Sequence, residues 1–329
     1  MKYSVTSFVR LITATARSCS ARRVIAGSAS ILTFIMLLPM LVQPSPLHAQ
    51  ERADTGDVRF SLTALGSYQF KSDVDGGGDL SVARYNLNAE VVGRIDNNLR
   101  VGIGLTYEFD DYDFSGLTDF AVAQPWGDVH RFGISVPIFY SIDSNWRLFL
   151  SPSVQWSGES GAKWGDAVAY GAVFAVSHSF RPGLVLGLGA GVFSNIEKTT
   201  FFPYIAVNWQ INEQLRLINP FRTSPAGPAG LELAYAFNRN WELGIGGAYR
   251  SYRFRLDEDG PIPNGIGESK TVPVYARLSY SLSRDFRIDL YGGATFSNKL
   301  RVDNEDGDEI YRTKYDVPPI VALSLTARF

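Results

Sequence analysis

Arginines beside short polar turns are the residues of this chain with the clearest potential for chemistry. Polar and apolar side chains alternate along most segments after residue 57, and charged residues fall on the polar face. Those nearest to the turns are Arg59, Arg94, Arg100, Arg147, Arg216, Arg287, Arg328, Glu242 and Asp289. A space lined by charges of one sign concentrates the electric field and favours counter-ions, here anions. The alternative is that these arginines pair with carboxylates on neighbouring segments and fill the space.

Residues suited to catalysis are sparse. After residue 49 the only histidines are His130 and His178, which the pattern places at opposite ends of their segments, and no G-x-S-x-G or H-E-x-x-H sequence occurs. The only cysteine, Cys19, precedes the apolar run of residues 25–42, so the later segments have no thiolate chemistry. We therefore expect neither an enzyme nor a cofactor. A Ser–His or Asp–His site built on His130 is the least favoured alternative.

The first 49 residues have the layout of a secretory signal peptide. Five basic residues and no acidic ones precede or adjoin the apolar run, and Pro44, Pro46 and the small residue Ala49 follow it. We expect residues 1–49 to be removed after export, and the alternative is a retained N-terminal anchor helix. Removing the five positive charges takes the formal charge from −2 to −7 (−2 − 5), which argues against a nucleic-acid partner.

Two kinds of connection alternate along residues 50–329. Six are tight turns rich in Asn, Asp, Gly and Pro, at residues 95–98, 142–145, 180–183, 211–214, 237–240 and 282–285. Seven are longer and polar, at residues 71–79, 110–127, 158–165, 195–200, 223–230, 257–270 and 298–318. This alternation predicts fourteen strands, with twelve as the alternative. Because residues 215–221 are a short segment broken by Pro220, we expect the hairpin there to be irregular. The predicted fold is all-β: one closed antiparallel up-and-down transmembrane β-barrel over residues 50–329.

The spacing of aromatic residues matches the thickness of a membrane. Trp146 and Trp156 share the apolar face of one segment ten residues apart, and Phe286 and Phe296 repeat this spacing. Ten residues at about 3.3 Å each, tilted by about 40°, project onto roughly 25 Å, the height of the lipid-facing band of a barrel. The predicted aromatic girdle consists of Trp146, Trp156, Phe286, Phe296, Trp209 and Trp241.

The last ten residues resemble a known family. Val321, Leu323, Leu325, Ala327 and Phe329 share one face of a predicted strand, and polar residues occupy the other face. This segment resembles the closing strand of Gram-negative outer-membrane β-barrels. The resemblance implies a place in the outer membrane and insertion by the barrel-assembly machinery. The assembly signal would then be Phe329 with Ala327, Leu325 and Leu323.

Acidic residues gather in the long connections, which the topology places outside the cell. They are Asp110, Asp111, Asp113, Asp257, Glu258, Asp259, Asp303, Glu305, Asp306, Asp308 and Glu309. The last cluster lacks the spacing and the distal glutamate of an EF-hand. We expect solvated loops, bridged to lipopolysaccharide phosphates by divalent cations, rather than a metal site formed by Asp303, Glu305, Asp306 and Asp308. Outer-membrane lipid and lipopolysaccharide are thus the expected partners.

Two local features modify this architecture. After Tyr249 the alternation changes phase, which predicts a β-bulge or an extension of the sheet beyond the membrane. Inward-facing glycines, among them Gly187, Gly189 and Gly191, leave room either for water or for a loop folded into the lumen.

A barrel of this size can hold a narrow aqueous lumen, because its strand number lies between the filled eight-stranded and the wide sixteen-stranded classes. We expect a passive, porin-like channel for small hydrophilic solutes with an arginine-rich periplasmic constriction. The first alternative is a non-transport barrel that displays its acidic loops for adhesion or envelope organisation. A more remote alternative is an outer-leaflet lipid-modifying enzyme.

Overall fold

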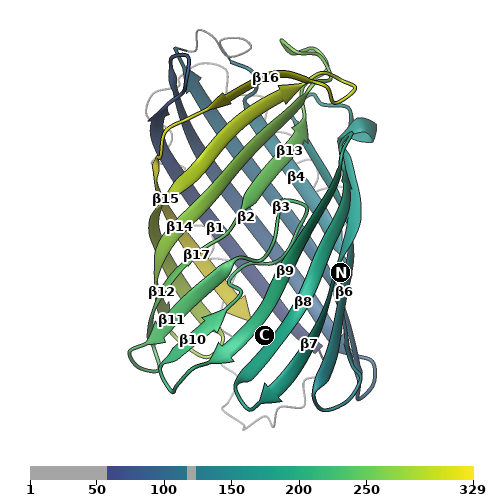
Figure 1. The fold of residues 1–329 in the computed structure, drawn as a ribbon, viewed down its shortest axis with the longest axis vertical. Coiled ribbons are helices and arrows are strands. Elements are labelled where there is room, and N and C mark those ends of the chain that lie inside the picture. Colours follow the sequence, from purple (N-terminus) through teal and green to yellow (C-terminus); the bar gives the residue numbers. More distant parts are fainter. Residues whose placement is uncertain (1–57, 117–123) are drawn as a thin grey trace, which may run out of the picture. The chain divides into compact units, whose positions relative to one another are not determined.

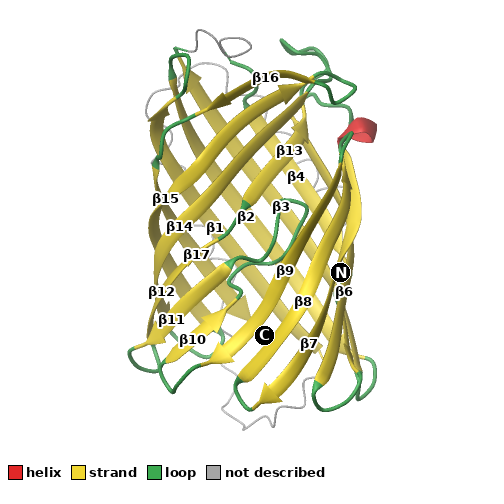
Figure 2. Ribbon diagram, in the orientation of Figure 1, coloured by secondary structure: helices red, strands yellow, loops and turns green. Residues whose placement is uncertain are grey.

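The computed structural model describes residues 58–116 and 124–329. The predicted signal peptide, residues 1–49, lies outside the described residues, as do residues 50–57 and 117–123. The described residues form a closed antiparallel β-barrel of fourteen strands, which confirms the predicted fold class and strand count. Figure 1 shows the tilted strands of this wall, and Figure 2 shows one short helix, η2 (Trp164–Ala167). No helix within the described residues is long and apolar enough to cross a bilayer.

The wall contains seventeen strand segments. They are β1 (Val58–Asp73), β2 (Asp79–Arg94), β3 (Leu99–Ser115), β4 (Asp128–Ser135), β5 (Ile138–Ser141), β6 (Trp146–Glu159), β7 (Val168–Arg181), β8 (Leu184–Asn195), β9 (Thr199–Gln210), β10 (Leu215–Ile218), β11 (Leu231–Ala236), β12 (Trp241–Gly247), β13 (Arg250–Arg255), β14 (Ile266–Ser281), β15 (Phe286–Asp303), β16 (Glu309–Lys314) and β17 (Pro319–Arg328). Three consecutive pairs, β4–β5, β12–β13 and β16–β17, each follow the same neighbouring strand, so each pair is one interrupted strand. The wall closes where β1 pairs with β17.

Side-chain caps explain five of the six tight turns. In each, the side chain of the second turn residue accepts backbone N–H groups two and three residues later, at 2.7–3.2 Å. The accepting residues are Asp96, Asp143, Asn212, Asn238 and Ser283. Such local bonds are why Asn, Asp and Ser favour turns. The sixth turn uses Gly183 at φ 79°, a conformation that costs glycine little. We call this end of the barrel the short-turn end, and the opposite end the long-loop end.

Apolar side chains cover the outside of the barrel. On β14, Val274, Leu278 and Tyr280 are exposed, whereas Arg277 and Ser279 between them are buried inside. In water this exterior would be unfavourable, and its period-2 pattern of apolar outside and polar inside is that of a transmembrane barrel. The protein is therefore an outer-membrane β-barrel.

The irregularity predicted after Tyr249 is present, and it changes which residues of β13 face the inside of the barrel. The wall is interrupted between Gly247 and Arg250, so that Tyr252 and Phe254 of β13 point to the inside, whereas Ile245 of β12 points outside. At its far end β13 also meets β6 through one parallel bridge, Arg255 to Gly158. The long-loop end is therefore narrowed by a strand that crosses toward the opposite wall (Figure 1).

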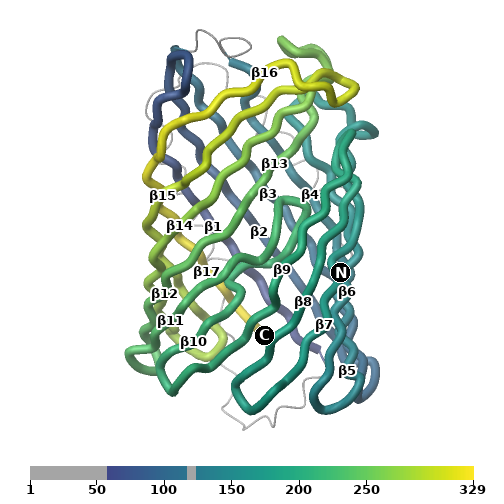
Figure 3. Tube along the Cα trace, in the orientation of Figure 1, coloured from purple at the N-terminus to yellow at the C-terminus, as the bar shows by residue number. Residues whose placement is uncertain are grey.

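The wall is incomplete beside β9. Only Asn208–Gln210 of this strand pair with β10, because β10 is four residues long. The side chain of Asn219 partly replaces a neighbouring strand: it accepts the Val207 N–H at 2.6 Å and donates to the carbonyls of Ile205 and Gly230 at 3.0 and 2.7 Å. The irregular hairpin expected around Pro220 is thus present. Beyond it, the chain between β10 and β11 leaves the wall (Figure 3).

One predicted loop is largely strand. Residues 298–318 were expected to be a polar connection, but β15 continues to Asp303 and pairs with β16 over Lys299–Asp303. A bulge at Ser297, with φ 53°, shifts the register between the spanning part of β15 and this extension. The polar composition of this segment predicted a loop. It is a strand because its inner face packs against apolar residues rather than water.

Candidate functional site

The arginines that the sequence singled out line the short-turn end of the lumen. Arg59, Arg94, Arg100, Arg147 and Arg328 are exposed on the inner face and form no ion pair among residues 58–116 and 124–329. Arg94 and Arg100 lie directly opposite each other on β2 and β3. Unpaired cations in water-accessible positions make this mouth electropositive.

The other predicted pore-lining residues join a buried ion network on the wall of β10 to β15. Arg216 and Arg287 both bind Glu242, at 2.7 and 3.0 Å, and Arg287 binds Asp289 at 2.7 Å. These four residues therefore follow the alternative interpretation, in which arginines pair with carboxylates on neighbouring strands. The short-turn end therefore combines unpaired arginines on one side with a neutralised network on the other.

The centre of this network is a residue that the sequence did not single out. The Arg277 guanidinium, 4% exposed, binds the carboxylates of Glu232, Glu242 and Asp289, and Glu232 is fully buried. Tyr275 adds a hydrogen bond to Glu232 at 3.1 Å. Gly244 makes room for the network, since a Cβ there would lie 2.7 Å from the Glu232 carboxylate carbon. The alternation along β14 predicts that Arg277 faces inward. It does not predict which three carboxylates Arg277 binds.

Residues 219–230, which we call the inner loop, fold into the lumen. Phe221 packs edge-on against the inward ring of Tyr275, with ring centroids 5.7 Å apart, and the Arg250 guanidinium lies 4.9 Å from the Phe221 ring. The Ser251 N–H donates to the Ala226 carbonyl at 2.8 Å, and Thr223 bonds to the inward Tyr204. The expectation that residues 223–230 form an external loop is wrong.

An ion pair ties the inner loop to the far wall. Arg222 binds Glu90 on β2, the strand half-way round the barrel from β10. The Arg222 side chain is nevertheless 55% exposed and Glu90 is 19% exposed, so water reaches this level of the lumen. The sequence left open whether inward glycines leave room for water or for a folded-in loop, and both occupy the lumen. At Gly189 and Gly191 the room is taken by the rings of Tyr204 and Phe202.

The long-loop end is packed rather than open. Its interior holds an apolar cluster made of Val74, Leu80, Val82, Tyr112, Phe114, Trp126, Val129, Phe254, Leu256, Leu300, Val302 and Tyr315. Beneath it, Arg131 binds Asp110 at 2.8 Å and Glu108 at 3.3 Å, and stacks on the Tyr252 ring at 4.7 Å. Packing of β13 against β2, β3 and β15 therefore closes this end in the conformation described.

Two acidic residues expected in solvated loops are buried. Asp110 is 1% exposed because it pairs with Arg131, and Asp303 is 0% exposed because it pairs with Arg253 at 2.8 Å and with Arg301. The prediction of solvated acidic residues is wrong at these two positions. Glu305, Asp306 and Asp308 are exposed at the hairpin tip, away from the buried Asp303. Among the described residues no group of three or more His, Cys, Asp or Glu side chains is arranged to hold a metal ion.

The predicted girdle residues lie on the outer face, and their contact with lipid stays a prediction. Trp146, Trp241 and Phe296 are each about two-fifths exposed, at 43%, 41% and 43%. The list is completed by Phe286 and Trp209, which are half-buried, and by Trp156, which stacks on Trp164 with ring centroids 4.2 Å apart.

The two histidines, on β4 and β7, lie beside opposite ends of β6. His130 pairs with Gly158 and His178 with Trp146, twelve residues apart (158 − 146), or about 40 Å along a strand. At His130, Nε2 lies 3.2 Å from the Ser160 hydroxyl and Nδ1 lies 3.0 Å from the Tyr107 hydroxyl. Ser160 is placed like a nucleophile beside a base, but a phenol rather than a carboxylate orients the ring.

Residues 64–328 match the model of a family described as a domain of unknown function, DUF6268. The chain belongs to this family. None of the curated proteins matches it.

Among the solved structures that this chain resembles are a channel, a transporter and a porin. The COG4313 outer membrane channel from Pseudomonas putida F1 is 12% identical with a TM-score of 0.46, covering 88% of this chain and 100% of that one. The toluene transporter TodX from P. putida is 13% identical with a TM-score of 0.40, covering 83% and 90%. The KdgM porin is 10% identical with a TM-score of 0.33, covering 81% and 99%.

Proposed function

We propose that this DUF6268 protein is a passive outer-membrane channel for small hydrophilic solutes, with a preference for anions. The observation that carries the proposal is the exposure of Arg222, which lies inside the barrel and yet is 55% exposed. Water at that level indicates a solvated space between the inner loop and β2. A fully packed barrel interior would bury this guanidinium.

The short-turn mouth supports the anion preference. Arg59, Arg94, Arg100, Arg147 and Arg328 bring positive charge to the periplasmic end, and no carboxylate in the described residues pairs with them. A low-dielectric wall around such charges raises the local concentration of anions. The constriction proper would lie deeper, where the inner loop crosses the lumen between β10 and β2.

Conduction requires a second conformation at the long-loop end. In the conformation described, Tyr112, Trp126 and Phe254 fill this end, and each is 2% exposed or less. The strand that carries Phe254 is interrupted at its base and meets β6 through a single bridge.

The apolar cluster also favours one competing function. A barrel closed by side-chain packing at the outer end could serve without transport, as a support for the loops at that end. This second candidate predicts no conductance under any condition.

Planar-bilayer recording of the purified protein tests the two candidates. The wild type is compared with a variant in which residues 221–229 are replaced by a short Gly-Ser linker, and with Phe254→Ala, which loosens the apolar cluster. Channel function predicts rare ohmic steps for the wild type, larger steps without the inner loop and more frequent steps for Phe254→Ala. Silence of all three proteins across a wide voltage range, with the folded barrel verified by its heat-modifiable gel migration, would rule out the channel.

A further inference from the structure

A ladder of cations on the outer wall has no explanation in the channel. Lys270 on β14 lies directly opposite Lys299 on β15, and Lys299 lies directly opposite Lys314 on β16. In the next row toward the long-loop end, Arg301 lies opposite Arg312. Like charges directly opposite each other destabilise a sheet. Three adjacent strands therefore present an arrangement that is unfavourable unless an anion lies among the cations.

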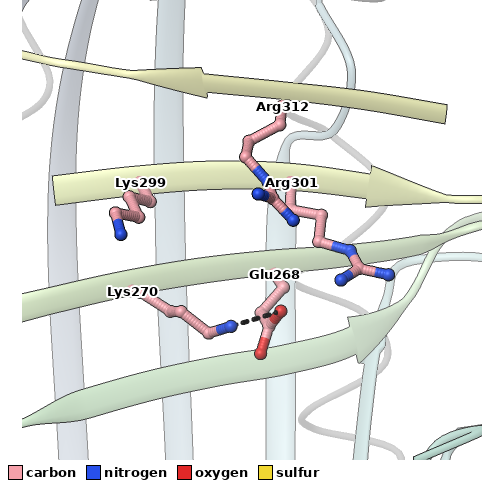
Figure 4. A pocket seen from close by; sticks show the side chains of 5 residues that line it. All are labelled: Glu268, Lys270, Lys299, Arg301 and Arg312. Carbon is pink, nitrogen blue, oxygen red and sulfur yellow. Dashed lines mark ion pairs between the residues drawn. The ribbon is translucent and has the colours of Figure 1, made fainter. Parts of the chain in front are cut away.

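These side chains point away from the lumen. Leu300 and Val302, which alternate with Lys299 and Arg301 along β15, belong to the apolar cluster inside the barrel. Four of the cations, Lys270, Lys299, Arg301 and Arg312, line a cavity of about 150 Å³ together with Glu268. Figure 4 shows Arg312 reaching from β16 across β15 toward Arg301, and Lys270 directed at Glu268.

Carboxylates in and beside the cavity neutralise only part of the charge. Glu268 binds Lys270 at 3.0 Å and lies 3.9 Å from Lys198. Outside the lining, Glu309 binds Arg312 and lies 3.4 Å from Arg301, which also binds Asp303. Lys299 and Lys314 form no ion pair with any described residue. The five residues that line the cavity are four cations and one carboxylate, a net charge of +3 (4 − 1).

The position of these cations relative to the apolar band indicates which anion they can meet. Phe296, on the outer face of β15, marks the predicted outer edge of the apolar band, and Lys299 follows it by three residues. Three residues at about 3.3 Å, tilted by about 40°, place Lys299 about 8 Å above that edge. This is the level of lipid headgroups on the long-loop side, and not of either mouth of the channel.

We propose that this cavity binds a phosphate group on the headgroup of an outer-leaflet glycolipid. Phosphate oxygens accept charge-assisted hydrogen bonds from several cations at once, and arginine adds paired N–H donors in the matching geometry. Lys270, Lys299, Arg301 and Arg312 come from three strands and can contact one phosphate together. The lipid acyl chains would lie along the apolar wall below Phe296.

Calorimetric titration of the full-length protein in non-ionic detergent tests the site. The probes are a diphosphorylated lipid A, the same lipid with both phosphates removed, and inorganic phosphate. Of these three probes, we expect only the phosphorylated lipid to bind strongly. Lys299→Ser with Arg312→Ser should weaken it about thirtyfold, since each cation near a phosphate surface accounts for roughly fivefold. Lys163→Ser, which removes an exposed lysine elsewhere at the long-loop end, should change nothing.

Three outcomes would overturn the proposal. Equal binding of the dephosphorylated lipid would mean that the acyl chains alone are recognised. Equal affinity for inorganic phosphate would identify a site for free phosphate instead of a lipid. An unchanged affinity in the folded double variant would place any phosphate contact elsewhere. None of these results bears on conductance, so the channel proposal is tested separately.

Discussion

Arg222 and Glu90 form an ion pair across the barrel, between a loop that belongs to the β10 side and the wall that β2 forms on the other side. This pair fixes one end of the inner loop, while Phe221 on Tyr275 and Ala226 on Ser251 hold the rest against the near wall. The loop is therefore anchored on both sides of the solvated space. Its removal from either anchor should change how the lumen conducts.

Breaking this ion pair should alter conductance without unfolding the barrel. An exposed ion pair contributes about 0–1 kcal/mol, so Glu90→Gln should leave the unfolding midpoint nearly unchanged. Single-channel recordings should show larger and noisier current steps. The exchanged pair, Glu90→Arg with Arg222→Glu, should restore the wild-type current. Identical recordings from all variants would mean that the loop does not border the conducting path.

Loss of Arg277 should destabilise the barrel strongly. Arg277→Met leaves the buried Glu232 without its cation, and breaking a buried pair by removing one partner costs about 3–5 kcal/mol. Arg287→Met, at a partly exposed member of the same network, should cost clearly less. Urea unfolding in detergent, followed by tryptophan fluorescence, measures both. Equal midpoints for the two variants would show that Arg277 is not the centre of the network.

Ion selectivity should depend on the arginines at the short-turn mouth. Replacing Arg100 and Arg147 by Ser removes two unpaired cations, so the reversal potential in a salt gradient should move toward that of an unselective pore. Lys163→Ser, at an exposed lysine of the long-loop end, serves as the control and should have no effect. A reversal potential that stays the same in the double variant contradicts the predicted constriction.

Acid should weaken the short turn that the Asp143 side chain caps. The Asp143 carboxylate accepts N–H groups of Trp146 and Asn145, and these bonds lower the pKa of Asp143 below its ordinary value. Because the folded-state pKa is lowered, the stabilisation is complete above the unfolded-state pKa and is lost as the pH falls through the folded-state pKa. The difference in unfolding midpoint between wild type and Asp143→Asn should shrink on acidification from pH 7 toward pH 3. The difference for Asn212→Ala, in a turn with the same geometry and no carboxylate, should stay constant.

The Ser160–His130 contact should have no catalytic role. The histidine lacks an orienting carboxylate, and the Tyr107 hydroxyl occupies its second nitrogen. Purified protein mixed with phospholipid or lipid A should release no fatty acid, and Ser160→Ala should behave like the wild type. Fatty-acid release that disappears in both Ser160→Ala and His130→Ala would establish a lipid hydrolase.

The wall of the barrel was predictable because its information is local. Alternation fixes the face on which each residue lies, as at Arg277 and Leu278, and turn residues such as Asp96 and Asp143 mark where strands reverse. The phase change after Tyr249 was also visible in the sequence. Its consequence was not, because the inward turn of β13 depends on apolar partners on β2, β3 and β15.

The interior was less predictable because its contacts join residues that are distant in the sequence. Arg222 and Glu90 are 132 positions apart, and Arg253 and Asp303 are 50 apart. The polar composition around Asp110 and Asp303 predicted loop residues. The sequence does not show whether a carboxylate is hydrated or is paired with a buried arginine. The cation ladder was missed for a related reason: register between strands, rather than residue type, brings Lys299 beside Lys270 and Lys314.

The seam between β1 and β17 has a consequence for the order of folding. There the hydroxyls of Thr63 and Thr326, 263 positions apart, lie 3.3 Å from each other, whereas the other antiparallel strand pairs in the described wall join near neighbours in the chain. Contacts of such sequence separation form slowly, because the entropy of closing the intervening chain is lost first. Hairpins held by their own turn caps can therefore assemble early, and we expect the contact between β1 and β17 to form last. Until then two unsatisfied strand edges must be shielded from water-free lipid and from other chains.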